Sequence, residues 1–394
     1  MSGVTKSIYN HEVIDIIKMW DQQIKTIEGI LPQNYTIKNI IDILKDFYPH
    51  EWNSVQAKYE YYYIKDKHLK RIKNKYRYNM LPPEQLIKKS QSFKKITSKE
   101  YQLEYSKNYN KDVCYEQYNS LKKKRQPKIE KINSKIEKAK QKTQQVTPDF
   151  LEKLIGLYNR KNTSQKDKMY IIVELKKYYN SQVIQFFFKL NDTEINKQLR
   201  EIAFHHLQSF NYQPRLRGQK HMQIHTKSKK TKDYLKNEYA FQTYKIPFDP
   251  DELEYRINNS FDQKIKNYDF FISHSSKDSK YVQKLITHLN RKGENVYCDW
   301  ISDSDYLKRH LVRQATLNVI KTRLEQSKKV VFVDSEYSTH SLWCKYELNY
   351  FYELKKPIYY IKTSDIERDN YNIILLRDKW FFDNNYRNIP LLEQ

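Results

Sequence analysis

Between residues 267 and 394, short apolar segments alternate with amphipathic ones, and this alternation restricts the fold more than any other feature of the chain. Residues 268–273 read YDFFIS, a pattern typical of a buried strand. The next segment places Val282, Leu285, Ile286 and Leu289 on one helical face, and Gly293 follows where a left-handed helix end is favoured. Further strands are predicted at 295–298, 328–333 and 357–361, with helices at 311–326 and 343–354. Strands alternating with helices predict an α/β fold, a flavodoxin-like parallel sheet covered on both faces.

Such a sheet also predicts where a ligand binds. In an open doubly wound sheet, ligands bind beyond the carboxyl ends of the strands, where the strand order reverses. For a flavodoxin-like order, this crevice lies between the first and third strands. Residues 274–278 and 334–347 should line it, with Asp299 and Trp300 reaching in from the end of the second strand.

The first 260 residues show helical periodicity and few strand signals. A Lys-rich and Gln-rich segment at 119–145 predicts an exposed helix, interrupted near Pro127. A second helical block follows, then a basic linker, and Asp249-Pro250 predicts the start of a short helix. The expected divisions are a basic, Tyr-rich helical region at 1–146, a second helical block at 147–212, a linker with a short helix at 213–260, and the α/β domain at 261–394.

The positive charge is concentrated before the α/β domain. The formal net charge is +25, but residues 261–394 hold 22 Lys and Arg against 18 Asp and Glu. The basic N-terminal region is therefore a candidate site for nucleic acid or another anionic trigger. The alternative is a compositional bias of AT-rich coding, which enriches Lys, Asn, Ile and Tyr without selection for a partner.

Several other classes of protein are disfavoured. With only 5 Gly, the chain cannot build a glycine-rich phosphate loop. Its 3 Cys are far apart, which fits a reducing cytosol and no structural zinc, and His221 and His225 have the spacing of two metal ligands but no evident third. No apolar stretch is long enough to cross a bilayer, so we expect a cytoplasmic protein with no membrane contact and no metal.

Four segments of the α/β region resemble, in order and spacing, the signatures of the TIR (Toll/interleukin-1 receptor) family. They are YDFFISHSSKD at 268–278, GENVYCDW at 293–300, Ser327 before the VVFV strand, and SLWCKYEL at 341–348. The resemblance covers about a third of the chain, and the N-terminal region resembles no family that we recognise.

The resemblance implies an NAD-cleaving TIR domain of prokaryotic type, with NAD as substrate and no further cofactor. Glu347 matches the family's catalytic glutamate, and Trp343 precedes it by one helical turn. Nicotinamide leaves as a neutral molecule, so the ribose develops positive charge that a carboxylate can stabilise. The resemblance also implies substrate contacts from Ser275 and Ser276, and from Asp299 and Trp300.

The resemblance further implies an NAD+ nucleosidase or ADP-ribosyl cyclase in immune or antiphage defence, activated by homo-oligomerisation through TIR–TIR contacts. Linear ADP-ribose, a cyclic isomer and a base-exchanged nucleotide all remain open as products. A non-catalytic TIR interaction module is the alternative. In that case Glu347 would be a solvated carboxylate beside Lys345 or Arg377, Trp343 a core anchor, and Ser275 and Ser276 helix-capping hydroxyls.

Overall fold

The computed structural model describes residues 4–377, and within that range the chain forms two compact units. The first unit comprises residues 4–138 and 203–223, and the second comprises 139–202 and 224–377. Two helices, α7 (Lys111–Gln141) and α11 (Lys197–Ser209), contribute residues to both units. Residues 147–202, which are most of the second helical block, thus belong to the same compact unit as the sheet.

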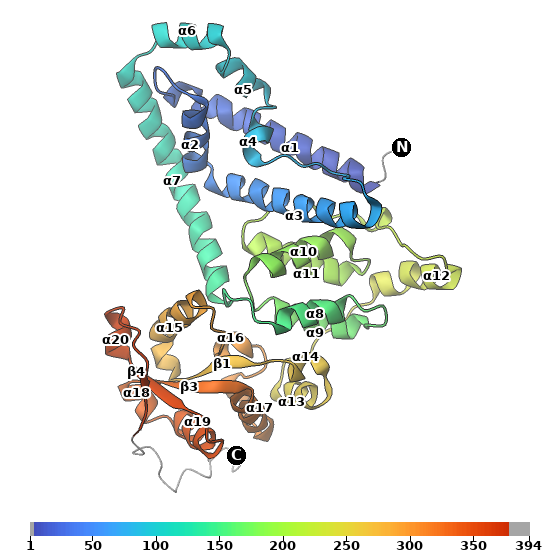
Figure 1. The fold of residues 1–394 in the computed structure, drawn as a ribbon, viewed down its shortest axis with the longest axis vertical. Coiled ribbons are helices and arrows are strands. Elements are labelled where there is room, and N and C mark those ends of the chain that lie inside the picture. Colours follow the sequence, from blue (N-terminus) through green and yellow to red (C-terminus); the bar gives the residue numbers. More distant parts are fainter. Residues whose placement is uncertain (1–3, 378–394) are drawn as a thin grey trace. The chain divides into compact units, whose positions relative to one another are not determined.

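The first unit is built from helices, as the sequence periodicity predicts (Figure 1). Besides α7, they are α1 (Val4–Ile27), η1 (Glu28–Ile30), α2 (Ile37–Phe47), α3 (Pro49–Lys73), α4 (Pro83–Ile87), α5 (Gln91–Ile96), α6 (Lys99–Lys107) and η2 (Gln219–His221). Trp20, Ile24 and Leu44 are fully buried in its core. Because burial of such side chains contributes about 1.5–3 kcal/mol each, these apolar stripes hold the helices together.

One prediction for this region is wrong. Helix α7 continues through Pro127 without the expected interruption. A proline removes one backbone donor and strains the preceding turn. No residue of α7 is buried, so water can satisfy the carbonyl group that loses its partner.

In the second unit, a helical block precedes the sheet. It comprises α8 (Phe150–Tyr158), α9 (Gln165–Leu175), α10 (Ser181–Thr193), the start of α11, α12 (Lys229–Asn237), η3 (Tyr239–Phe241), α13 (Pro250–Asn259) and α14 (Phe261–Lys264). The basic linker is therefore partly helical, because Ser228 caps α12 by accepting a hydrogen bond from the backbone of Thr231. The helix start predicted at Asp249-Pro250 is confirmed, with Asp249 as the cap of α13.

The sheet has the predicted flavodoxin-like order, β2-β1-β3-β4-β5. Its strands are β1 (Tyr268–Ser273), β2 (Val296–Tyr297), β3 (Ser327–Asp334), β4 (Ile358–Lys362) and β5 (Ile374–Leu375). The first four strands pair in parallel. The fifth strand, which was not anticipated, pairs antiparallel with β4. Since β1 lies between β2 and β3, the order reverses beside β1, and a ligand crevice is expected there.

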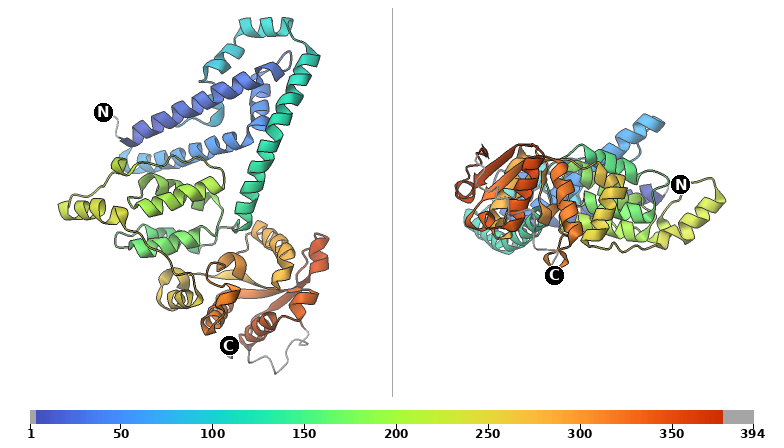
Figure 2. Two further views of the ribbon diagram at one scale, coloured as in Figure 1. Left: turned by 180° about the vertical axis from the view of Figure 1, so that it is seen from behind. Right: turned by 90° about the horizontal axis from the view of Figure 1, so that it is seen from below.

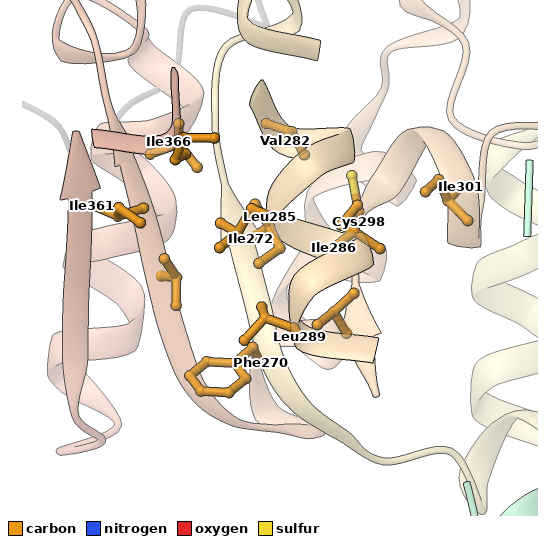
Figure 3. Packing of buried hydrophobic residues seen from close by; sticks show 13 residues of the cluster. Phe270, Ile272, Val282, Leu285, Ile286, Leu289, Cys298, Ile301, Ile361 and Ile366 are labelled. Carbon is orange, nitrogen blue, oxygen red and sulfur yellow. The ribbon is translucent and has the colours of Figure 1, made fainter. Parts of the chain in front are cut away.

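Helices cover both faces of the sheet, as two views show (Figures 1 and 2). One face packs on α15 (Ser279–Arg291) and α20 (Thr363–Glu367), through a cluster that includes Phe270, Ile272 and Leu285 (Figure 3). The other face packs on α17 (Gln314–Glu325) and α19 (Leu342–Glu353). Short helices η4 (Ser276–Asp278), α16 (Asp299–Ser302) and α18 (Glu336–Thr339) follow the ends of β1, β2 and β3, and η5 (Arg309–Leu311) precedes α17. Gly293 has a φ of +84°, as its predicted place after α15 requires.

Across residues 4–377, no helix combines the length and the apolar character needed to span a bilayer.

Candidate active site

A cavity opens beyond the carboxyl end of β1, and the segment after β2 and the first turns of α19 complete its wall. Its volume is about 730 Å³, within the usual range of small-molecule sites. All six residues predicted from the sequence to contact substrate or catalyse lie on its wall. These are Ser275, Ser276, Asp299, Trp300, Trp343 and Glu347.

Glu347 is the carboxylate at the base of this site. It lies in α19 with 9% of its surface exposed, so it is not the solvated helix residue of the alternative interpretation. Its Oε2 accepts a 2.6 Å hydrogen bond from the hydroxyl of Ser273, the last residue of β1. Burial raises the pKa of Glu347 to about 8, the hydrogen bond from Ser273 opposes this, and the nearby charge of Asp299 adds to it.

Trp343 stands one turn before Glu347 on the same helix and lines the same cavity. It is only partly buried and also packs on the core between α17 and α19. Trp343 therefore both lines the cavity and anchors the helix in the core. Ser341 caps the helix by accepting a hydrogen bond from the backbone of Cys344. Burial raises the pKa of the Cys344 thiol to about 12, and this residue is therefore a poor nucleophile.

The loop after β1 supplies hydroxyl groups. Ser275 is partly buried and caps η4, while Ser276 is exposed, and both face the cavity. Asp278 follows them and accepts a 2.6 Å hydrogen bond from Ser335, which comes just after β3. This bond joins the two loops that flank the crevice, so Asp278 has a structural role that its place in the sequence did not indicate.

Asp299 and Trp300 begin the short helix α16, which lies just beyond β2. Trp300 lies 6.3 Å from the ring of His274, measured between ring centroids. Its indole Nε1 is buried and has no acceptor among the described residues. A buried donor without a partner is costly, so a bound ligand that accepts this hydrogen bond would be favoured.

Most of the apolar wall and the Ser273 hydroxyl that holds the Glu347 carboxylate were not predicted from the sequence. Side chains alternate between the two faces of β1, so Ser273 lies on the same face as Phe271, which packs toward α19. The position of the Ser273 hydroxyl could therefore have been predicted from the sequence. Leu307, Val312 and Ile320 come from the segment between β2 and β3, which carries no motif. Among the described residues, the cavity wall contains two carboxylates and no Lys or Arg.

This sheet order, with a buried glutamate at the switch point and a tryptophan one turn before it, defines the C-terminal part of the chain as a TIR domain. Comparison with known proteins agrees. The family pattern described as "TIR domain" matches residues 270–386.

Two curated relatives extend this assignment. The chain is 36% identical, over 95% of its own length and 96% of the relative's, to a Cytobacillus dafuensis protein named "Putative cyclic ADP-D-ribose synthase TIR2". Over 32% of the chain and 66% of the relative, it is 33% identical to the Bacillus cereus (strain MSX-D12) protein named "Probable 3' cyclic ADP-D-ribose synthase ThsB'". The chain therefore belongs to the TIR-domain proteins, and its helical region is shared with the first relative. No solved structure matches the chain significantly.

Proposed function

We propose that this protein cleaves the bond between nicotinamide and ribose in NAD and closes the remaining ADP-ribose into a cyclic product. The observation that carries the proposal is the buried carboxylate of Glu347, oriented by Ser273 at the end of a cavity large enough for part of a dinucleotide. The names of the two relatives support cyclisation over simple hydrolysis.

The reaction separates charge in a way that suits this site. The C1′–N1 bond breaks and its electron pair leaves with neutral nicotinamide, so positive charge develops on the ribose. The carboxylate of Glu347 stabilises that charge, and a preorganised group of this kind typically accounts for a factor of about 100 to 1,000 in rate. Because its pKa is about 8, Glu347 largely carries its proton at neutral pH in the empty cavity, and the positive nicotinamide ring of bound NAD favours its ionised form.

The nucleophile decides the product. If water attacks the cation, it loses a proton and linear ADP-ribose forms; if a hydroxyl or the adenine of the same molecule attacks, a cyclic isomer forms. The apolar side chains of Leu307, Val312 and Ile320 on the cavity wall favour the second outcome, because they limit the water next to the cation.

We also propose that the active form is a homo-oligomer. The diphosphate of NAD carries negative charge that cationic side chains commonly neutralise, yet the described cavity wall has neither Lys nor Arg. A second copy of the chain, docked through TIR–TIR contacts, would supply the missing partners. The helical regions would then serve as sensor and assembly unit in defence signalling inside the cell.

The test compares nicotinamide release from NAD by the wild-type chain, Glu347→Gln and Glu353→Gln. Glu353 ends the same helix and is exposed, so its substitution is the matched control. We expect Glu347→Gln to lose about 100-fold to 1,000-fold in rate while Glu353→Gln retains the wild-type rate. Mass spectrometry of the product separates cyclic from linear ADP-ribose, since the two differ by one water molecule.

Equal release by all three proteins, at every protein concentration, would contradict the proposal. Specific activity that rises with protein concentration supports the oligomeric form. Activity that is independent of concentration down to the monomer would show that one chain holds a complete site.

A further inference from the structure

Three side chains of the kinds that bind transition metals meet beside the cavity. His274 follows β1, whereas Cys298 and Asp299 follow β2, and parallel neighbouring strands bring these ends to the same edge. His274 Nε2 lies 3.8 Å from Asp299 Oδ1 and 4.0 Å from Cys298 Sγ, and Cys298 Sγ lies 4.0 Å from Asp299 Oδ1. Within the described residues, this is the group of His, Cys and acidic side chains that is close enough to share an ion.

The tautomer of His274 suits a metal ligand. Its Nδ1 lies 3.0 Å from the carbonyl oxygen of Ile272, and a carbonyl can only accept, so Nδ1 carries the proton. The lone pair of Nε2 therefore faces the thiol and the carboxylate. Metal-binding histidines are held in this way by a hydrogen bond from the other ring nitrogen.

The spacing matches a single small ion. Metal–ligand bonds of 2.0–2.3 Å at tetrahedral angles separate the ligand atoms by roughly 3.5 Å, so each pair needs to close by only about half an ångström. A set of one sulfur, one nitrogen and one carboxylate oxygen favours Zn²⁺ or a similar borderline-soft cation over Mg²⁺ or Ca²⁺. The fourth position would face the cavity and hold water.

Access and charge also fit. His274 and Asp299 line the cavity, and Cys298 is buried behind them with its sulfur directed toward the side where the strands end (Figure 3). The carboxylate of Asp299 lies on a cavity wall that has no Lys or Arg among the described residues, so no cationic side chain of the wall repels a divalent cation.

We propose that His274, Cys298 and Asp299 form a binding site for a thiophilic divalent cation such as Zn²⁺, and that an ion bound there inhibits the neighbouring active site. On binding, the Sγ–metal bond forms and the thiol proton leaves to solvent, while His274 and Asp299 coordinate through the Nε2 lone pair and a carboxylate oxygen. The inhibitory half rests on the proposed NAD cleavage. Zn²⁺ with the Cys298 thiolate and the Asp299 carboxylate makes a neutral centre where Asp299 alone carried a negative charge, so binding removes an attraction for the cationic nicotinamide ring and for the positive charge that develops on the ribose. The binding half is independent of it.

Binding is tested with Co²⁺ as a spectroscopic probe of the full-length chain. We expect one Co²⁺ per chain with a thiolate-to-cobalt charge-transfer band, which Zn²⁺ abolishes by displacement. Calorimetry in two buffers of different ionisation enthalpy should show one proton released per ion. Cys298→Ser should lose the band, and His274→Ala should weaken Co²⁺ binding by about tenfold or more.

Cys114→Ser is the matched control, since this free cysteine lies in the other compact unit. It should retain both the band and the affinity. Circular dichroism shows whether each variant folds. If Cys298→Ser does not fold, His274→Ala and Asp299→Asn test the same site, because each removes another proposed ligand. No thiolate band in the wild-type chain, or an unchanged band in Cys298→Ser, would overturn the site.

Inhibition is measured separately, as nicotinamide release with and without Zn²⁺. We expect Zn²⁺ to lower the rate of nicotinamide release by the wild type and by Cys114→Ser. The rate of Cys298→Ser should be the same with and without Zn²⁺. Zinc binding in a chain that releases no nicotinamide would leave the metal site standing and refute only the proposed enzyme. Equal inhibition of Cys298→Ser would refute the inhibitory role.

Discussion

At the scale of single residues, the environment of Glu347 sets how the site responds to pH. A carboxyl group loses its proton less readily when it is buried, and the single hydrogen bond from Ser273 offsets only part of this cost. Its raised pKa means that the folded chain holds this proton until the pH approaches 8. In the free protein, the reactive carboxylate therefore forms only under mildly alkaline conditions.

We accordingly expect kcat/KM for nicotinamide release to rise about tenfold per pH unit and to level off near pH 8. The profile of kcat should level off at lower pH, because bound NAD⁺ favours the ionised form. Rates measured from pH 5 to 9 at low and saturating NAD give both profiles. A kcat/KM that is already constant from pH 5 would show that Glu347 is ionised in the free protein.

Ser273→Ala tests the pKa of Glu347 by removing the hydroxyl that donates a hydrogen bond to it. Since the hydrogen bond from Ser273 lowers the pKa of Glu347, its loss should move the rising limb of kcat/KM to higher pH. A merely structural role for Ser273 would lower the rate without moving the limb. Ser279→Ala, at another hydroxyl of the cavity wall, should leave the limb in place.

At the scale of single elements, helix α7 contains a proline, Pro127, that would ordinarily interrupt a helix. Pro127 is exposed in the middle of the helix and leaves the carbonyl of Lys123 without its usual donor. The helix continues because neighbouring turns remain bonded and water reaches the free carbonyl. We would expect the predicted interruption only if this turn were buried, because water could not then reach the carbonyl group.

Pro127→Ala should therefore raise the free energy of unfolding of the first unit, by about 1–3 kcal/mol. The reason is that alanine restores the missing hydrogen bond and removes the ring clash. Lys131→Ala, one turn later on the same exposed helix, should change the free energy by less than about 0.5 kcal/mol. Urea unfolding followed by circular dichroism measures both, and a loss of stability in Pro127→Ala would contradict the account.

Helix α9 joins the sheet region through buried charges. Glu174 accepts a 2.6 Å hydrogen bond from Lys266 and a 2.9 Å bond from Lys177, and Lys177 also lies 3.5 Å from Asp303. Arg323 completes the cluster at 2.8 Å from Asp303. Asp303 directly follows α16, so this cluster anchors the end of the short helix that carries Asp299 and Trp300 into the site.

Glu174→Gln should destabilise the second unit by about 3–5 kcal/mol, because it removes the carboxylate that is hydrogen-bonded to the buried ammonium group of Lys266. Glu152→Gln, an exposed change on α8, should be neutral. The double variant Glu174→Gln with Lys266→Met should recover part of the loss, since it removes the unpaired charge. Urea unfolding measures the stability of all three variants. A Glu174→Gln variant as stable as the wild type would show that the buried ion pair does not stabilise the unit.

At the scale of the whole molecule, the second compact unit combines helices and sheet in a way that protects a sheet edge. Strand β2 lies at the edge of the sheet, and the side chain of Gln144 bonds to both backbone groups of Val296, at 2.6 and 3.0 Å. The backbone of Gln144 pairs in turn with Lys177 and Tyr179. An uncovered edge strand invites pairing with another chain, so this contact limits unplanned association.

Gln144→Ala should uncover that edge. We expect a loss of about 1–3 kcal/mol in the stability of the unit, because two buried backbone groups lose their partner. We also expect more self-association, measured by light scattering over a range of concentrations. Gln145→Ala alters the exposed neighbouring side chain and should behave as the wild type. Unchanged association in Gln144→Ala would show that the edge is protected by other means.

The sequence alone determined the alternation of strands and helices in the last third of the chain, the helical character of the region before it and the position of Glu347 on the helix after the third strand. These features are encoded locally, since hydrophobic periodicity and short motifs depend on residues a few positions apart. The prediction of Asp299 and Trp300 at the site also followed from topology, because parallel strand ends meet at one edge.

Only the tertiary structure decided what surrounds these residues. The burial of Glu347, its bond to Ser273 and the cluster of His274 with Cys298 and Asp299 depend on packing between strands and helices that are far apart in the chain. The same holds for Glu174 and Lys266, whose charges are buried only because two distant segments meet. Side-chain neighbours of this kind arise from long-range packing, which local periodicity does not record.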